Sequence, residues 1–133
     1  MIDRSLTVEI LREQVKQIED RSRKYGWEIE VIDTTVYVKL KSSRDNEIYM
    51  LRMKCENYPE KIPRVEFVDS SYRVPKIRAW PIMRPKAGKP IIQTDRMFIC
   101  FAPGSGTPCT VGEIVQLIQN RIDSDDYRGR HPG

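Results

Sequence analysis

One cysteine of this chain follows a stretch that could hold a thiol ready for chemistry. Residues 96–110 read RMFICFAPGSGTPCT, so an apolar, strand-like run ends at Cys100 and a loop rich in Gly, Pro and Ser follows. An exposed thiol that is partly ionised can act as a nucleophile and can exchange thioesters. Free cysteines are also among the most buried residues in proteins. The sequence thus leaves two interpretations of Cys100, a surface nucleophile or the apolar end of a strand.

The other two cysteines and the single histidine are weaker candidates. Cys109 directly precedes the T-x-x-E pattern of Thr110 and Glu113, which is typical of a helix N-terminus, where the helix dipole lowers the pKa of a thiol. Cys109 is therefore a rival nucleophile, with packing beneath the helix as its alternative role. Cys55 ends a predicted strand and is interpreted as structural. His131 lies in a polar tail that nothing in the sequence brings to a cysteine, which disfavours a Cys–His hydrolase.

Periodic apolar residues predict the elements that would position these side chains. Helical spacing starts near Val8 and Leu11, and Gly26 is expected to end the first helix. Alternation of apolar and polar residues predicts strands at residues 27–32, 36–41, 47–54 and 65–68, joined antiparallel as a meander. A second helix begins after Thr110 and runs to Ile122. The sequence therefore predicts an α+β fold: a helix, a four-stranded antiparallel meander, a long irregular segment that carries Cys100, and a helix packed on the sheet.

Length and composition are those of one soluble domain. The 133 residues are 39% hydrophobic and 32% charged, without a signal peptide or a membrane-spanning run. We expect a single domain over residues 1–122 and a polar, flexible tail over residues 123–133. Three cysteines without a CxxC pair and one histidine argue against a disulfide framework and a zinc site, and they suit the reducing cytoplasm.

The net charge of +4 is concentrated in one stretch. Between Tyr72 and Lys89 there are six basic residues and no acidic one: Arg73, Lys76, Arg78, Arg84, Lys86 and Lys89. Such a run is either a solvated loop or a docking surface for an acidic protein or a nucleic acid. Only Tyr72 and Trp80 are aromatic there, which disfavours nucleic acid.

The order of several motifs resembles the ubiquitin-conjugating enzyme family, in particular its bacterial branch. After the leading helix and the meander come Tyr58-Pro59, Pro63, Val65 and Phe67 of a YPxxxPxVxF pattern, then Trp80-Pro81, Ile99-Cys100, and Thr107-Pro108 with Thr110. The resemblance covers about residues 6 to 122. It rests on the ordered series, since no single motif is diagnostic.

The resemblance implies a transferase with a cysteine thioester intermediate and no cofactor. Cys100 would carry a ubiquitin-like protein, received from an activating (adenylating) enzyme, and pass it to a lysine amine of a target. The first helix, on the side of Arg12 and Lys16, and the basic loop 73–89 would be docking surfaces for the activating enzyme or a ligase. Some bacterial relatives belong to operons tied to antiphage defence.

The chain departs from the family where His-Pro-Asn is common, because Pro90-Ile91-Ile92 stands there instead. Donors for the oxyanion of the transfer would then be Gln93, Thr94 or backbone N–H groups of residues 101–106. Asp95 could orient the attacking lysine or accept its proton. The acidic residues after the last helix are alternatives that could instead be solvated tail charges: Asp123, Asp125 and Asp126.

The missing asparagine also leaves a second interpretation open. A catalytically inactive variant of the same fold could bind a ubiquitin-like protein or scaffold a partner.

Overall fold

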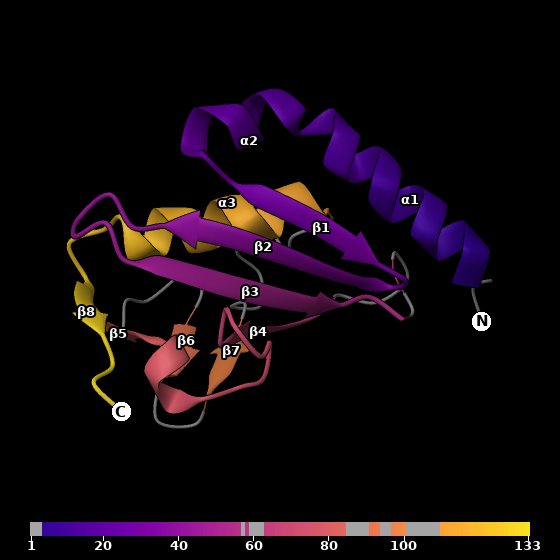
Figure 1. Cartoon of the computed structure of the whole chain (residues 1–133). Helices are drawn as coiled ribbons and strands as arrows, with labels where there is room; N and C mark the ends of the chain where they lie inside the picture. Colours follow the sequence, from indigo (N-terminus) through magenta and orange to yellow (C-terminus); the bar gives the residue numbers. More distant parts are fainter. Residues whose placement is uncertain (1–3, 57, 59–62, 85–90, 94–96, 101–109) are drawn as a thin grey trace.

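The computed structural model describes residues 4–56, 58, 63–84, 91–93, 97–100 and 110–133 (Figure 1). It opens with two helices, α1 (Arg4–Gln17) and α2 (Glu19–Tyr25), where the sequence predicts one. The backbone leaves the helical region at Ile18, with φ −102° and ψ 17°, and Ile18 lies against Gly112, a residue of the chain's last helix. Gly26 ends α2 as predicted: its φ of +74° is left-handed, and its N–H bonds to the Ser22 carbonyl.

The predicted meander is confirmed as one antiparallel sheet. Its strands are β1 (Glu28–Ile32), β2 (Thr35–Lys41), β3 (Ile48–Lys54) and β4 (Arg64–Val68), in the order β1-β2-β3-β4. Alternation puts apolar side chains such as Val36, Val38 and Leu40 on one face, all at most 1% exposed. The opposite face carries Lys39, Arg52 and Glu66 together with the apolar Met50 and Val68, so the sheet has an inner and a mixed outer side.

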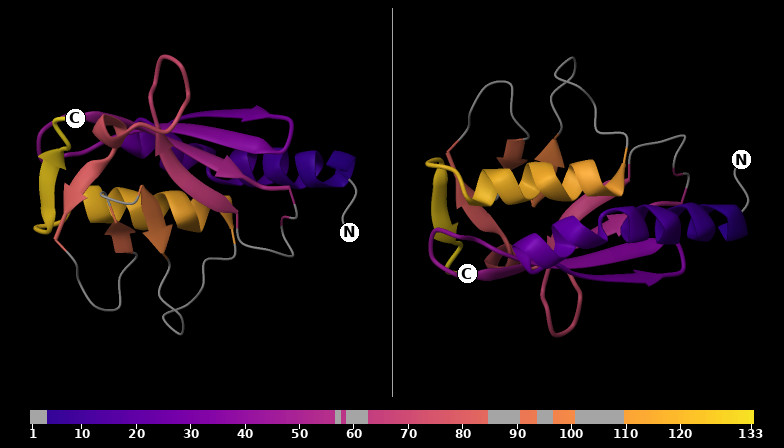
Figure 2. Two further views of the ribbon diagram at one scale, coloured as in Figure 1. Left: turned by 90° about the horizontal axis from the view of Figure 1, so that it is seen from below. Right: turned by 90° about the horizontal axis from the view of Figure 1, so that it is seen from above.

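The helix α3 (Val111–Ile122) covers the inner face of the sheet. Thr110 is its N-cap, and the Thr110 Oγ1 accepts a hydrogen bond from the Glu113 N–H at 3.1 Å, as the T-x-x-E pattern predicts. Five apolar residues on one stripe of α3 are fully buried: Val111, Ile114, Val115, Ile118 and Ile122. In Figures 1 and 2, α3 lies on one side of the sheet, and α1 and α2 run along its β1 edge.

The basic segment and the tail contain more structure than the sequence predicts. The short helix η1 (Ile77–Ala79) and strand β5 (Pro81–Met83) lie within the segment expected to be irregular. Strand β8 (Tyr127–Arg130) lies within the tail expected to fray, and it pairs with β5. The physical reason is burial: Tyr127 is only 6% exposed, and its ring packs edge-on against Tyr49.

A second hairpin carries the candidate nucleophile. Strands β6 (Ile91–Gln93) and β7 (Phe98–Cys100) pair antiparallel, with β6 beside β5 and β7 beside β4. The α+β layout of helix, four-stranded antiparallel sheet and C-terminal helix is therefore confirmed. In the part of the chain described here, no helix has the length and apolar character needed to cross a membrane.

Candidate functional site

Cys100 is the last residue of β7, at the end of the β6–β7 hairpin. Its backbone partner on β6 is Ile91, whereas Gln93 pairs with Phe98. Cys100 and Gln93 are therefore offset by two residues along the hairpin, about 7 Å of strand. The central pair, Ile92 and Ile99, is buried at 5% and 7% exposure and anchors the hairpin to the core. The side chains of Cys100 and Gln93 lie outside the described part of the structure.

Several other predicted site residues also lie outside the part of the chain that the structure describes. Thr94, Asp95, Cys109 and the loop 101–106 lie outside the described residues, as do Lys86 and Lys89 of the basic segment. Ile92, the residue that aligns with the asparagine of the resemblance, is apolar and buried at 5% exposure.

The start of α3, eleven residues after Cys100, is held by a side chain of α1. The Gln14 Oε1 accepts a hydrogen bond from the Val111 N–H at 3.2 Å and another from the Tyr58 hydroxyl. The Tyr58 carbonyl in turn accepts from the Thr7 hydroxyl at 3.2 Å. These hydrogen bonds give Tyr58 a structural role, and burial raises the pKa of its hydroxyl. No sequence pattern singled out Gln14, because only its contacts distinguish it from the other polar residues of α1.

Cys55 is structural, as the sequence indicates. It is 1% exposed, and its Sγ lies 3.5 Å from the Met53 carbonyl oxygen, to which it donates. Burial raises the pKa of this thiol to about 12, so it is protonated at neutral pH and cannot attack a carbonyl. Cys55 is therefore excluded as the nucleophile.

The acidic residues after α3 have structural partners. The Asp123 carboxylate accepts from the Ser43 N–H at 2.7 Å and from the Gln119 amide at 3.0 Å. Asp126 forms a buried ion pair with Arg121 at 3.0 Å, and Asp125 forms an exposed one with Arg44 at 3.1 Å. These contacts join the residues after α3 to the body of the fold. The alternative of solvated tail charges is wrong for the buried Asp126, whereas Asp125 stays exposed to solvent.

Trp80 and His131 have structural roles as well. Trp80 is fully buried and packs edge-on against Phe67, so it is not an exposed interface anchor. The His131 N–H donates to the Trp80 carbonyl at 2.9 Å, which continues the β5–β8 pairing.

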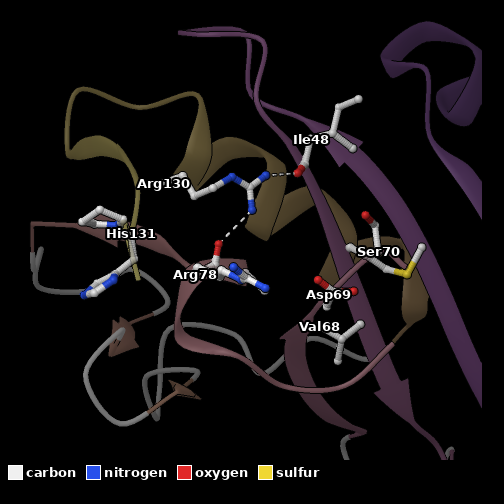
Figure 3. Close-up of a pocket in the computed structure, with 10 residues that line it drawn as sticks. Ile48, Val68, Asp69, Ser70, Arg78, Arg130 and His131 are labelled. Carbon is white, nitrogen blue, oxygen red and sulfur yellow. Dashed lines mark hydrogen bonds between the residues drawn. The ribbon is translucent and has the colours of Figure 1, made fainter. Parts of the chain in front are cut away.

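A hollow of about 360 Å³ lies on the outer side of the molecule, between β3, the end of β4, η1 and the C-terminal residues (Figure 3). We call it the basic pocket. Its apolar part is formed by Ile48, Met50, Val68 and Ala79, and its polar part by Asp69, Ser70, Arg78, Arg130 and His131, with Pro132 beside them. Sequence reasoning missed this pocket, because its residues come from four separate segments.

Arg130 builds the wall of the basic pocket. Its guanidinium pairs with Glu47 at 2.9 Å, lies 4.5 Å from the centre of the Tyr49 ring, and donates to the carbonyl oxygens of Arg78 and Ile48. Figure 3 shows the last two of these bonds. Because its guanidinium N–H groups already have these partners, Arg130 joins β8 to η1 and β3 and is not expected to bind a ligand.

Asp69 closes the other side of the basic pocket. Its carboxylate accepts from the N–H groups of Tyr72 at 2.8 Å and Ser71 at 2.9 Å. These bonds hold the pKa of Asp69 below its usual value, and the nearby charges of Lys76 and Arg78 lower it further. Asp69 is therefore a fixed negative charge at neutral pH.

The loop that follows Asp69 crosses the outer face of the sheet. Arg73 pairs with Glu30 at 2.6 Å and covers the Tyr37 ring at 4.3 Å, while its carbonyl accepts from Arg52 at 2.9 Å. Arg52 is itself paired with Glu66 beneath the loop, and both are largely buried. The loop is thus pinned at Arg73, and Figure 2 shows it projecting from the side of the sheet opposite α3.

No group of three His, Cys, Asp or Glu side chains among the described residues could hold a metal ion. Comparisons with protein-family models, with curated proteins and with solved structures find no match to this chain.

Proposed function

We propose that this protein is a ubiquitin-conjugating-enzyme-like transferase that carries a ubiquitin-like protein on the Cys100 thiol. The observation that supports the proposal is the order of the elements around that cysteine. A leading helix, a four-stranded antiparallel meander, a hairpin ending at Cys100 and a helix capped by Thr110 follow one another as the family resemblance implies. The burial of Cys55 adds support, because it removes one of the three thiols from consideration.

The proposed reaction has two acyl transfers. The Cys100 thiolate attacks the C-terminal carbonyl carbon of the modifier on the activating enzyme, the new C–S bond forms, and the enzyme's own thiolate leaves. A lysine amine of the target then attacks the same carbonyl, the amide bond forms, and the Cys100 thiolate is released. The amine loses a proton in this second step, and Asp95 is our candidate to accept it.

Each tetrahedral intermediate carries a negative oxygen that needs hydrogen-bond donors. Because Ile92 is apolar and buried, we assign this role to Gln93, Thr94 or the N–H groups of residues 101–106. The modifier, the activating enzyme and a ligase or target protein are the partners that the proposal requires.

A reconstituted charging reaction tests the proposal. The protein is mixed with a ubiquitin-like modifier, an activating enzyme for that modifier and ATP, and the products are run on a non-reducing gel. We expect an adduct that a thiol reagent removes, that Cys100→Ser abolishes and that Cys109→Ser leaves in place. An adduct lost only in Cys109→Ser would move the nucleophile to that residue.

The second candidate function is a non-catalytic module that binds a ubiquitin-like protein or scaffolds a partner. The observation that favours it is the buried, apolar Ile92 at the position where the family's asparagine supports the reaction. Co-elution of the protein with the modifier, without any adduct in the charging reaction, would support this second function and contradict the first.

A further inference from the structure

The structure divides the cations of the basic segment into two groups. Arg73 is paired with Glu30 and Arg84 with Asp126, at 2.6 and 3.4 Å. Lys76 and Arg78 form no ion pair with any described residue. Among the described cations of this segment, the two without an ion pair are thus Lys76, which directly precedes η1, and Arg78, which lies within it.

One of these two cations lines the basic pocket, and the other lies on the loop beside it. Arg78 lines it, and Figure 3 shows its guanidinium pointing towards Asp69. Lys76 lies over the Tyr72 ring at 5.4 Å, on the adjoining loop, and acts on the same carboxylate. Lys76 and Arg78 lie near the Asp69 carboxylate, whereas Arg130 is already paired with Glu47. These described side chains, three basic and two acidic, leave a net charge of +1 beside the pocket.

The same place exposes apolar surface. Ile48 lines the pocket and is 49% exposed, although Met50, Val68 and Ala79 beside it are buried. Tyr72 and Val74 on the adjoining loop are 77% and 41% exposed. An apolar floor beside unpaired cations suits a ligand that combines aliphatic side chains with carboxylates.

We propose that the basic pocket docks an acidic segment of a partner protein, with an aliphatic side chain against Ile48 and Met50 and carboxylates facing Arg78 and Lys76. The apolar floor favours a peptide over nucleic acid, whose binding relies on phosphate contacts and base stacking. The pocket is built from β3, β4, η1 and the C-terminal residues, so this inference does not depend on the thioester chemistry of Cys100.

A titration of the ¹⁵N-labelled protein followed by NMR tests the inference. The probe is a blocked peptide, Gly-Asp-Asp-Leu-Glu-Leu-Gly, and its counterpart has lysine in place of each acidic residue. We expect the acidic peptide to shift the amide signals of Ser70, Arg78, Ala79 and His131, less so at high salt, and the lysine peptide to leave them unchanged.

Variants distinguish binding at the basic pocket from non-specific attraction of the acidic peptide to a positively charged protein. Arg78→Glu should weaken binding of the acidic peptide about three- to ten-fold, because it replaces attraction by repulsion at an exposed site. Ile48→Asp should weaken it as well. Arg64→Glu is the matched control: Arg64 is exposed on β4 outside the pocket, so the same charge change there should alter affinity less than about two-fold.

Three outcomes would overturn the inference. The acidic peptide could leave the pocket amides unshifted at millimolar concentration, or Arg64→Glu could weaken binding as much as Arg78→Glu. An oligodeoxythymidine that shifts the same amides more strongly than the peptide would instead identify a nucleic-acid surface. Unchanged signals elsewhere in each variant's spectrum establish that its fold is retained.

Discussion

At the scale of single residues, Gln119 is a buried polar side chain whose hydrogen bonds join separate parts of the fold. It is 2% exposed on α3 and joins three segments. Its Oε1 accepts from the Trp27 indole at 2.8 Å, and its Nε2 donates to the Lys41 carbonyl at 2.9 Å and to Asp123. Polar groups this deeply buried must be hydrogen-bonded, so Gln119 and its partners depend on one another.

We therefore expect Gln119→Leu to lower the free energy of unfolding by about 2–3 kcal/mol, because the Trp27 N–H and the Lys41 carbonyl lose their partner inside the protein. Urea denaturation followed by tryptophan fluorescence measures the change. The control is Gln17→Leu at the exposed end of α1, which should change the stability by less than about 0.5 kcal/mol. Equal effects of the two substitutions would contradict the role given to Gln119.

At the scale of elements, the approach of the N-terminal helices to α3 depends on one glycine. A Cβ at Gly112 would lie 2.7 Å from the Ile18 Cγ2, which is closer than such atoms come in proteins. Ile18 is also where α1 ends and α2 begins, so it is held by its own backbone geometry. The lack of a side chain at residue 112 thus allows the helices to meet.

We expect Gly112→Ala to lower the free energy of unfolding by about 1–2 kcal/mol, although alanine favours a helix over glycine by about 1 kcal/mol. The crowding with Ile18 outweighs that gain. Thermal unfolding of the two single variants and the double variant Ile18→Ala/Gly112→Ala measures the coupling. In the double variant alanine should be tolerated or favourable at residue 112, and simple additivity of the two changes would contradict this explanation.

At the opposite end of α3, the attachment of the tail depends on a buried ion pair. Arg121 and Asp126 are nearly fully buried, and their ion pair joins α3 to the turn before β8. The Arg121 guanidinium also donates to the Arg84 carbonyl after β5. A buried charge without its partner is strongly destabilising, so this pair requires the tail to stay attached. Although residues 123–133 are mostly polar, Asp126 and strand β8 are packed against the rest of the fold.

At the scale of the whole molecule, two buried tyrosines and one buried cysteine keep their protons until the pH is unusually high. Burial raises the pKa of Tyr49 to about 12 and that of Cys55 to about 12, and it raises the pKa of Tyr127 as well. The Tyr49 and Tyr127 hydroxyls are hydrogen-bonded at 2.6 Å, and the Tyr127 hydroxyl donates to Asp45 at 2.8 Å. All three groups are therefore neutral in the folded protein when the unfolded chain begins to ionise.

Above about pH 9 to 10 the unfolded chain loses these protons and the folded protein keeps them. The unfolded state then binds fewer protons, so the free energy of unfolding falls as the pH rises, by at most about 1.4 kcal/mol per group and pH unit. Urea denaturation between pH 8 and 11 measures this slope. Tyr127→Phe should make it shallower, whereas Tyr72→Phe, at a residue 77% exposed, should leave it unchanged. Identical slopes in both variants would exclude the tyrosine pair as the cause.

The sequence by itself determined the elements and their order. Alternation over the meander, the capping pattern at Thr110 and the glycine at residue 26 act through neighbouring residues, and each corresponds to an observed strand, cap or helix end. Local patterns are readable because side-chain direction repeats every two residues in a strand and every 3.6 in a helix.

Only the tertiary structure decided which distant segments meet. The pairing of β5 with β8, the tie from Gln14 to Val111, and the neutralisation of Arg73 and Arg84 all join residues more than 40 positions apart, and residue types alone do not specify such partners. The basic pocket follows from the same contacts, because Arg78 and Lys76 are distinguished from the other cations of their segment by what the fold places beside them.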